Sequence, residues 1–403
     1  MNDSELAPAW PLRGDVAYLN HGSFGACPRA VLERQAELRA RLEAEPYRFL
    51  ARELEPLLDA AREELARFVG ADPEGLAFVP NATHGVNTVL RSVELERGDE
   101  LLTTDHAYNA CRNALDHVAA RSGARVVVAA VPFPLQRPEQ VVGAVLERVT
   151  PRTRLALLDH VTSPTGLVFP VQELVAELRA RGVDALVDGA HAPGMLELEL
   201  DRLGAAYYTG NAHKWLCAPK GAAFLHVRAD KRAALRPLSI SHGFNADRPT
   251  RSRFRLEFDW TGTDDPTPWL CIPEAIRVVG SLVAGGWAEV RARNRALALA
   301  ARDLLCAALH VPVPCPDEMI GSLASVPLPR LPAGSELARL DFDPLTDLVF
   351  ERHRIETWFY KWPAPGGKVV RASAQLYNTR EQFARLAAVL RDMGGTAANA
   401  GPG

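Results

Sequence analysis

The spacing of hydrophobic positions changes along the first two thirds of the chain. Between Pro28 and Gly70, apolar residues recur every three or four positions, which predicts two amphipathic helices, the second ending at Gly70. Short apolar runs then alternate with helical stretches such as 171–181. The runs are 76–79, 100–103, 124–130, 154–159, 184–188, 205–209 and 222–227. Strands that alternate with helices predict an α/β fold with a mostly parallel, seven-stranded sheet between helices.

The pattern changes after about Pro268. Long helices are predicted over 273–284 and 287–309, followed by a proline-rich stretch, shorter strands and a last helix whose apolar stripe ends at Met393. This change predicts a second, smaller α+β domain. We therefore expect four parts: an N-terminal segment packing near the active site and the small domain (1–27), a large cofactor-binding domain (28–267), a small C-terminal domain (268–394) and a disordered tail (395–403).

Polar turns follow the predicted strands, at the edge where ligands bind in open parallel sheets. After the first strand, Asn81 precedes a helix whose first N–H groups, those of Ala82 and Thr83, could hold a phosphate, although Asn81 capping the helix explains the turn equally simply. After the next strand come His106 and Tyr108. Either could stack on a flat ring, and we favour Tyr108.

Three later turns carry further candidate groups. Ser163 follows the strand at 154–159 and could reach a phenolic oxygen, although Ser-Pro turns are also common without a ligand. Asp188 ends the strand at 184–188, and Lys214 follows the strand after it. An amine can hold an aldehyde as a Schiff base, and a carboxylate can keep a pyridine nitrogen protonated. This pair predicts pyridoxal 5'-phosphate (PLP).

The composition favours a small-molecule partner. The chain has 403 residues, of which 24% are charged, and a net charge of -3. Since no basic run stands out, we expect no nucleic acid and no membrane as partner, and because no bilayer-spanning stretch or secretory signal is seen, we expect a cytoplasmic protein. The six cysteines lack zinc spacing, so no metal is expected. Gly366-Gly367-Lys368 leads into a strand, which disfavours a P-loop.

Seven segments occur in an order that resembles the class V aminotransferase family, a group of fold-type I PLP enzymes that includes cysteine desulfurases and isopenicillin N epimerase. The resemblance covers nearly the whole chain and implies the two-domain fold of those enzymes. The segments are Tyr18–Gly25, Asn81–His84, His160–Gly166, Val187–His191, His213–Trp215, Thr261–Thr263 and Arg371–Thr379.

The resemblance also implies roles for single residues at the cofactor. It makes Lys214 the Schiff-base lysine and Asp188 the partner of the pyridine nitrogen, and it places His191 and Ser163 near the phenolic oxygen. The catalytic group would be Lys214, Asp188 and His191. The residues expected near the phosphate are Thr83, His213 and Asn211, the last at a position where relatives often have serine.

The remaining implied residues concern the substrate and a second subunit. Arg371 would bind the substrate α-carboxylate, with His21 and Tyr360 also near the substrate. In the family the Gly-Thr element comes from the neighbouring protomer, so Gly262 and Thr263 would complete the partner's site. A homodimer with shared active sites is thus implied.

The reaction stays open at this point. Residues 358–363 lack the cysteine that cysteine desulfurases carry before the arginine segment, so persulfide chemistry is not expected. The motifs most resemble the isopenicillin N epimerase-like branch, which implies epimerisation or racemisation at the α-carbon of an amino acid or amino-acid-derived substrate through a quinonoid intermediate. Tyr108, His21 and Tyr360 are the candidates for the second proton donor.

Two alternatives from the same family are a C–S lyase and an aminotransferase. An alternative from another class is a non-enzymatic PLP-binding regulator, but the segment 1–18 is too short for the helix-turn-helix that such proteins usually carry. The sequence identifies neither the substrate nor the pathway.

Overall fold

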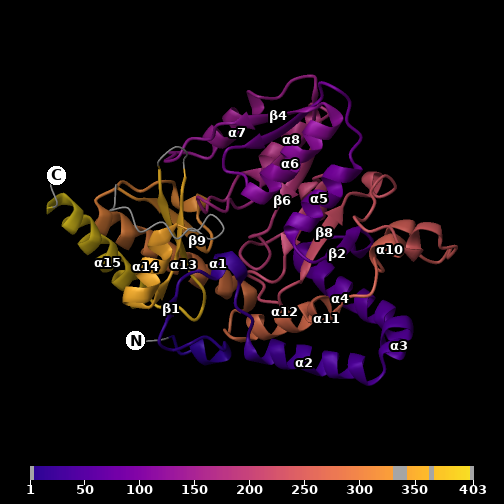
Figure 1. Ribbon diagram of the computed structural model, residues 1–403, viewed down its shortest axis with the longest axis horizontal. Helices are drawn as coiled ribbons and strands as arrows, with labels where there is room; N and C mark the ends of the chain where they lie inside the picture. Colours follow the sequence, from indigo (N-terminus) through magenta and orange to yellow (C-terminus); the bar gives the residue numbers. More distant parts are fainter. Residues whose placement is uncertain (1–3, 330–342, 363–366, 400–403) are drawn as a thin grey trace.

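The computed structural model describes residues 4–329, 343–362 and 367–399 (Figure 1). Its main sheet has seven strands in the order β2-β8-β7-β6-β5-β3-β4. β8 runs antiparallel to both neighbours, and the other strands are parallel to one another. The strands are β2 (Leu76–Val79), β3 (Glu100–Thr104), β4 (Arg125–Ala129), β5 (Thr153–Asp159), β6 (Asp184–Asp188), β7 (Tyr207–Asn211) and β8 (Ala223–Val227). The predicted α/β fold is confirmed.

Helices cover both faces of this sheet. In β5, every second side chain packs in a cluster with α5 (Ala82–Ser92) and α6 (Asn109–Ser122). The side chains between them pack with α7 (Glu139–Leu146) and α8 (Val171–Ala180) on the opposite face. Because both faces of the strands are buried in apolar clusters, polar groups gather at the strand ends and in the loops that follow.

The C-terminal part folds around a three-stranded antiparallel sheet. Its order is β11 (Trp358–Tyr360), β12 (Val369–Ser373) and β9 (Leu323–Pro327). α13 (Gly286–Leu309) packs on β9 and β12, and α15 (Arg380–Asn399) runs along α13 (Figure 1). This small sheet brings β12 next to the loops at the carboxyl ends of the large sheet, where the candidate residues lie.

The N-terminal segment is joined to the C-terminal part, because β1 (Ala17–Tyr18) pairs in parallel with β10 (Ile355–Glu356). The predicted domain boundaries stay a prediction. At the end of the chain the structure differs from the expected tail: α15 continues to Asn399, and residues 400–403 lie outside the described residues.

The other helices are α1 (His21–Phe24), α2 (Arg29–Ala44), α3 (Pro46–Arg48), α4 (Leu54–Val69), α9 (Leu200–Leu203), α10 (Arg253–Phe258), α11 (Thr267–Leu270), α12 (Ile272–Ser281) and α14 (Pro344–His353).

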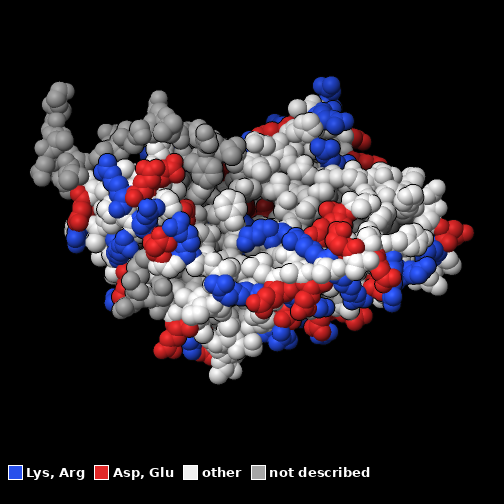
Figure 2. Space-filling model, turned by 60° about the horizontal axis from the view of Figure 1, so that its bottom comes forward, with Lys and Arg blue, Asp and Glu red and all other residues white. Residues whose placement is uncertain are grey.

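Surface charges of both signs are interspersed on the face drawn in Figure 2. Within the described ranges, no single helix is long and apolar enough to span a membrane; one bent pair, 267–281 with 286–309, reaches that length and composition only when its two helices are taken together. In the same part of the chain, no three His, Cys, Asp or Glu side chains are placed to hold a metal ion.

Candidate active site

Lys214 lies in the largely buried loop that follows β7. Its Nζ is 3.2 Å from Nε2 of His191, and the indole N–H of Trp215 donates to Nδ1 of the same histidine at 3.3 Å. Because an indole N–H only donates, neutral His191 carries its proton on Nε2 and presents it to Lys214. An amine can accept that hydrogen bond only when it is uncharged. The geometry therefore suits a neutral Lys214.

The electrostatics of the loop agree with a neutral amine. Burial, together with the charge of Arg371, lowers the pKa of Lys214 to about 8, although Asp188 acts in the opposite direction. Burial also lowers the pKa of His191 well below its usual value, with the charge of Lys214 adding to the effect. A lysine that is partly neutral near neutral pH can react with an aldehyde and can remove a proton.

Asp188 ends β6 and is only 4% exposed. Its Oδ1 accepts the backbone N–H of Ala190 at 3.0 Å, and the thiol of Cys111 donates to Oδ2 at 3.2 Å. Burial raises the pKa of this carboxyl. Among the described residues its hydrogen-bond donors are neutral, so a protonated ring nitrogen would supply the cation that a buried carboxylate requires.

The turn before α5 has the geometry of a phosphate cradle at a helix N-terminus. Oδ1 of Asn81 caps the helix by accepting the N–H of His84 at 2.8 Å. The N–H of Ala82 donates to Oδ1 of Asn211 at 2.8 Å, so the structure differs from the prediction that the Ala82 amide faces a ligand. The amide of Thr83 has no acceptor among the described residues and stays available for phosphate.

Two close contacts hold this cradle beside the lysine loop. A Cβ added at Gly85 would lie 2.3 Å from Oγ1 of Thr209, so glycine lets α5 approach β7. Nδ1 of His213 lies 2.9 Å from the carbonyl oxygen of Ala222, which leaves Nε2 for a ligand. Nε2 of His213 is thus a candidate second donor for a phosphate group.

Arg371 on β12 is buried without an acidic partner. It is 1% exposed, and it donates to the carbonyl oxygen of Ser163 at 2.9 Å, to Oγ of Ser23 at 2.8 Å and to Oδ1 of Asn20 at 3.3 Å. Its Nε has no partner, and none of its acceptors in the described part of the chain is a carboxylate. A permanently charged guanidinium in this state could bind an anion.

Aromatic side chains border the arginine. Tyr360 lies with its ring 5.3 Å from the guanidinium of Arg371, and its hydroxyl is 2.8 Å from Oγ of Ser163. Tyr108 precedes α6 and is 43% exposed, whereas His106 is fully buried with its ring nitrogens bonded to Thr165 and Val131. Of the two rings considered from the sequence, Tyr108 is the one left free to stack on a ligand.

His21 is not placed as expected from the sequence. Its side chain is fully buried; Nδ1 lies 2.8 Å from the hydroxyl of Tyr377, and Nε2 lies 3.0 Å from the backbone oxygen of Lys214. Burial lowers the pKa of His21 to about 3. The side chain holds the lysine loop in place, so we no longer place it against the substrate.

Gly262 and Thr263 lie at the surface of this chain. Both are exposed in the segment between α10 and α11, and a Cβ at Gly262 would meet nothing within 4 Å. This exposure leaves them available to a second subunit.

Four residues near the site were not singled out from the sequence. Ser23 and Asn20 contact Arg371, and their position in the segment Tyr18–Gly25 is the signal that could have found them. Asp159 ends β5 as Asp188 ends β6, so its strand-end position is also a signal. For Cys111 the sequence offers no signal, because its role depends on how α6 packs over β6.

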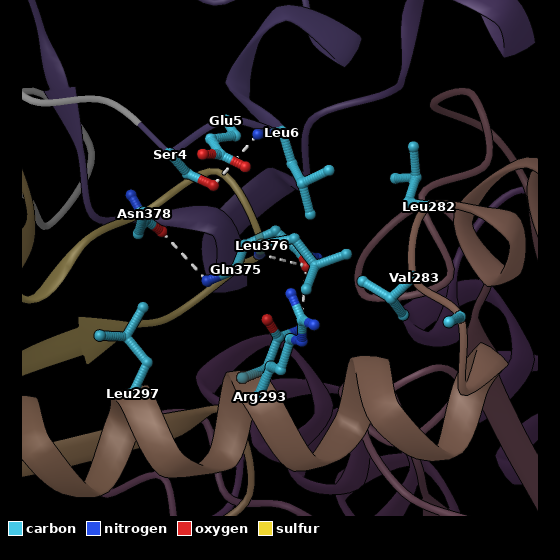
Figure 3. A pocket seen from close by; sticks show the side chains of 12 residues that line it. Ser4, Glu5, Leu6, Leu282, Val283, Arg293, Leu297, Gln375, Leu376 and Asn378 are labelled. Carbon is cyan, nitrogen blue, oxygen red and sulfur yellow. Dashed lines mark hydrogen bonds between the residues drawn. The ribbon is translucent and has the colours of Figure 1, made fainter.

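Figure 3 shows a cavity of about 540 Å³ whose lining does not include Lys214. Ser4, Leu282, Arg293 and Asn378 are among the side chains around it, and Asn378 accepts the backbone N–H of Gln375 there at 3.0 Å. Its lining contains none of the residues expected to bind the cofactor.

Comparison with known proteins gives one matching family and several full-length relatives. The model of the family "Aminotransferase class-V" matches residues 18–386. Isopenicillin N epimerase of Streptomyces clavuligerus is 39% identical over 93% of this chain and 94% of its own length. The enzyme of the same name from Amycolatopsis lactamdurans is 39% identical over 94% and 95%. A probable chloroplastic L-cysteine desulfhydrase of Arabidopsis thaliana is 31% identical over 92% and 82%.

Solved structures show the same fold. A mutant of the enzyme C-DES, with glycine covalently linked to its PLP cofactor, superposes with a TM-score of 0.78 at 23% identity, over 96% of this chain and 99% of that one. Cysteine desulfurase of Thermococcus onnurineus gives a TM-score of 0.78 at 19% identity, over 98% and 99%.

Proposed function

The chain belongs to the class V aminotransferase family of PLP-dependent enzymes, and on that basis we propose that it epimerises or racemises the α-carbon of an amino acid or amino-acid-derived substrate. The observation that carries the proposal is the buried guanidinium of Arg371, which has no acidic partner among the described residues and lies beside the loops of Lys214 and Ser163. The two relatives at 39% identity, both isopenicillin N epimerases, support this reaction over others.

The donors and acceptors of the site fit PLP. Lys214 supplies an amine that is partly neutral, Asp188 a buried carboxylate whose hydrogen-bond donors in the described part of the chain are neutral, and the amide of Thr83 with the side chain of His213 a place for phosphate. When bound, PLP supplies an aldehyde that condenses with amines and a ring that accepts electrons from the α-carbon. Tyr108 would lie against the ring, and the hydroxyl of Ser163 near its phenolic oxygen. Asn211 would act on the phosphate site through the helix start that it holds.

Arg371 would bind and orient the substrate. Its Nε–H, which has no partner among the described residues, and an Nη–H that would leave a neutral acceptor such as Asn20 can form a bidentate pair with a carboxylate, which fixes the direction of the α-carbon bonds. Ser23 and Asn20 hold the guanidinium from one side and Tyr360 from the other, so the clamp is rigid before substrate arrives.

Proton transfer would begin at Lys214. Its Nζ would take up the α-proton of the substrate, and His191 would hold the amine in position by the contact between its Nε2 and Nζ. Epimerisation then requires a proton from the opposite face. Tyr108 is the candidate that the structure favours over His21, because burial raises the pKa of Tyr108 and so keeps its hydroxyl protonated, whereas His21 faces the backbone of the lysine loop.

A C–S lyase is the second candidate, favoured by the L-cysteine desulfhydrases that match at 31 to 32% identity over 92% of this chain. The same residues would remove the same proton in that reaction. The outcomes differ in whether a substituent leaves the β-carbon, which depends on the substrate side chain. Persulfide transfer is disfavoured, since all six cysteines are buried and none follows Cys315.

We also propose that the enzyme acts as a homodimer in which Gly262 and Thr263 complete the partner's site. Their exposure within one chain supports this arrangement. The cytoplasmic location stays a prediction.

One experiment separates the two reactions. The purified enzyme is incubated in deuterated water with a panel of L-amino acids and cysteine derivatives, and products are followed by NMR and chiral chromatography. The proposal expects deuterium at the α-carbon with loss of handedness, and Lys214→Ala, as control, should exchange no deuterium. Pyruvate with a released thiol would replace the proposal by the lyase, and a keto acid by an aminotransferase.

A further inference from the structure

A second buried acid lies next to Asp188. Asp159 is the last residue of β5, Asp188 is the last residue of β6, and the two are register partners in the parallel pair. Register partners on neighbouring strands are about 5 Å apart and direct their side chains to the same face of the sheet. Their exposed fractions are 3% and 4%. Two carboxyl groups thus share one dry space at the end of the sheet.

The surroundings disfavour two charges in this space, so the two carboxyl groups are not expected to be ionised at the same time. Burial raises the pKa of each, and for Asp159 the charge of Asp188 raises it further, well above the usual value. Among the described residues, the other groups near the pair are Lys214 on the loop after β7, which favours ionisation, Cys111 on α6, whose own pKa is raised well above its usual value by burial, and the phenols of Tyr108 and Tyr208, whose pKa values the charge of Asp188 helps to raise. Because the charge of Asp188 adds to burial at Asp159, Asp159 is the acid of the pair that the surroundings favour as neutral.

Asp159 also contacts the loop that carries Tyr108. The backbone N–H of Tyr108, the N-cap residue of α6, lies near enough to this carboxyl group to favour its charged form. On the neighbouring strand, Asp188 has two neutral donors, the N–H of Ala190 and the thiol of Cys111. The two acids thus hold different parts of the same site.

We propose that Asp159 is a positioning residue that remains a neutral acid beside Asp188: it leaves Asp188 as the single carboxylate at the cofactor's ring nitrogen and holds Tyr108 at the ring face through the Tyr108 amide. The inference rests on the proposed cofactor contacts of Asp188 and Tyr108. A negative charge on Asp159 would repel the charge of Asp188 on the neighbouring strand. It would also attract the protons of Lys214 and Cys111 to Asp159 instead of Asp188.

The first test uses the apoenzyme and needs no reaction. A carboxyl whose pKa is raised on folding stabilises the fold only while protonated, and this stability is lost as the pH rises from the unfolded value, about 3.9, through the folded one. Asp159→Asn cannot lose a proton. Its Tm should therefore exceed that of the wild type by a margin that grows by a few degrees between pH 4.5 and pH 8. The exposed Asp116→Asn should show no such growth. A margin that stays constant or shrinks as the pH rises would overturn the neutral acid.

The second test measures PLP affinity by titrating the apoenzyme and following cofactor absorbance. Asp159→Asn keeps a neutral acceptor for the Tyr108 amide and should bind PLP within about threefold of wild type, whereas Asp159→Leu, of similar size, lacks the acceptor and should bind about tenfold more weakly, as for one lost hydrogen bond. Equal weakening in both variants would mean that the charge of Asp159 is needed, and wild-type affinity in Asp159→Leu would remove the positioning role. Either result overturns the inference.

The two tests separate this inference from the proposed reaction. If wild-type protein binds no PLP, the proposed function fails, and the apoenzyme comparison still decides whether Asp159 is neutral. If Asp159→Leu does not fold, Asp159→Asn alone carries both measurements, and a loss of affinity well beyond threefold in it would count against the inference.

Discussion

Replacing Arg371 by alanine should damage substrate binding far more than folding. Arg371 donates to the neutral acceptors Ser163, Ser23 and Asn20, so its removal leaves no buried carboxylate unpaired. The cost to the free energy of unfolding is then the loss of those hydrogen bonds, about 1 to 3 kcal/mol. Each charge-assisted hydrogen bond to a substrate carboxylate contributes about 1.5 to 3 kcal/mol, and two such bonds about 3 to 6 kcal/mol.

That energy corresponds to a fall in kcat/KM of about 10²- to 10⁴-fold, since about 1.4 kcal/mol gives a factor of ten. Steady-state kinetics with the substrate found in the deuterium experiment measure it, and Arg371→Lys should recover only part of the loss because lysine keeps the charge without the planar fork. The reasoning is refuted if Arg371→Ala keeps wild-type kcat/KM.

Arg62 offers a matched control. It is as deeply buried as Arg371 but pairs with the carboxylates of Asp59 and Asp259. Arg62→Ala should therefore lower the free energy of unfolding by about 1.5 to 3 kcal/mol, because the charge-assisted hydrogen bonds to Asp59 and Asp259 are lost while both acids keep Arg251 and Arg255, and should leave KM unchanged in the protein that remains folded. If instead Arg62→Ala raised KM and Arg371→Ala left KM unchanged, the buried position of Arg371 would not reflect anion binding.

Three further outcomes are expected. Asp188→Ala should fold, as judged by circular dichroism, and lose turnover by about 10²-fold or more, since a buried charge at the reacting ring is removed; unchanged turnover would remove Asp188 from the mechanism. The rate at which apoenzyme captures PLP should rise with pH toward a midpoint near 8, where the lowered pKa of Lys214 makes the amine neutral, and a midpoint above 10 would contradict this. Dilution to monomers should release PLP if Gly262 and Thr263 complete the partner's site, and a fully loaded monomer would refute the shared site.

The fold was largely predictable because hydrophobic spacing and topology are local signals. The strands 76–79 and 184–188 were predicted with the observed bounds, and the β7 strand was placed two residues too early. The reason for that shift is that the apolar run at 205–209 begins in the turn before the strand, where Ala205 and Ala206 are buried without pairing in the sheet. The end of α15 was also missed, because the Gly394-Gly395 pair reads as a helix stop.

The candidate site was only partly predictable, because the roles of several groups depend on contacts between distant segments. Motifs pointed to Lys214, Asp188 and Arg371 as chemical groups. They could not show that Asn211 takes the amide of Ala82, or that His21 holds the backbone of the lysine loop, since each contact joins residues more than 100 positions apart.

The central claim is that the amine of Lys214 holds the aldehyde of PLP. It is tested most directly by adding PLP to the purified protein, reducing with borohydride and locating the modified residue by mass spectrometry. We expect an imine absorbance band that borohydride removes, a phosphopyridoxyl group on Lys214, and neither in Lys214→Ala. The neighbouring Lys220, which donates to the carbonyl oxygen of Gly25 at 2.8 Å, is the internal control. A group on Lys220, or an adduct that persists in Lys214→Ala, would contradict the account.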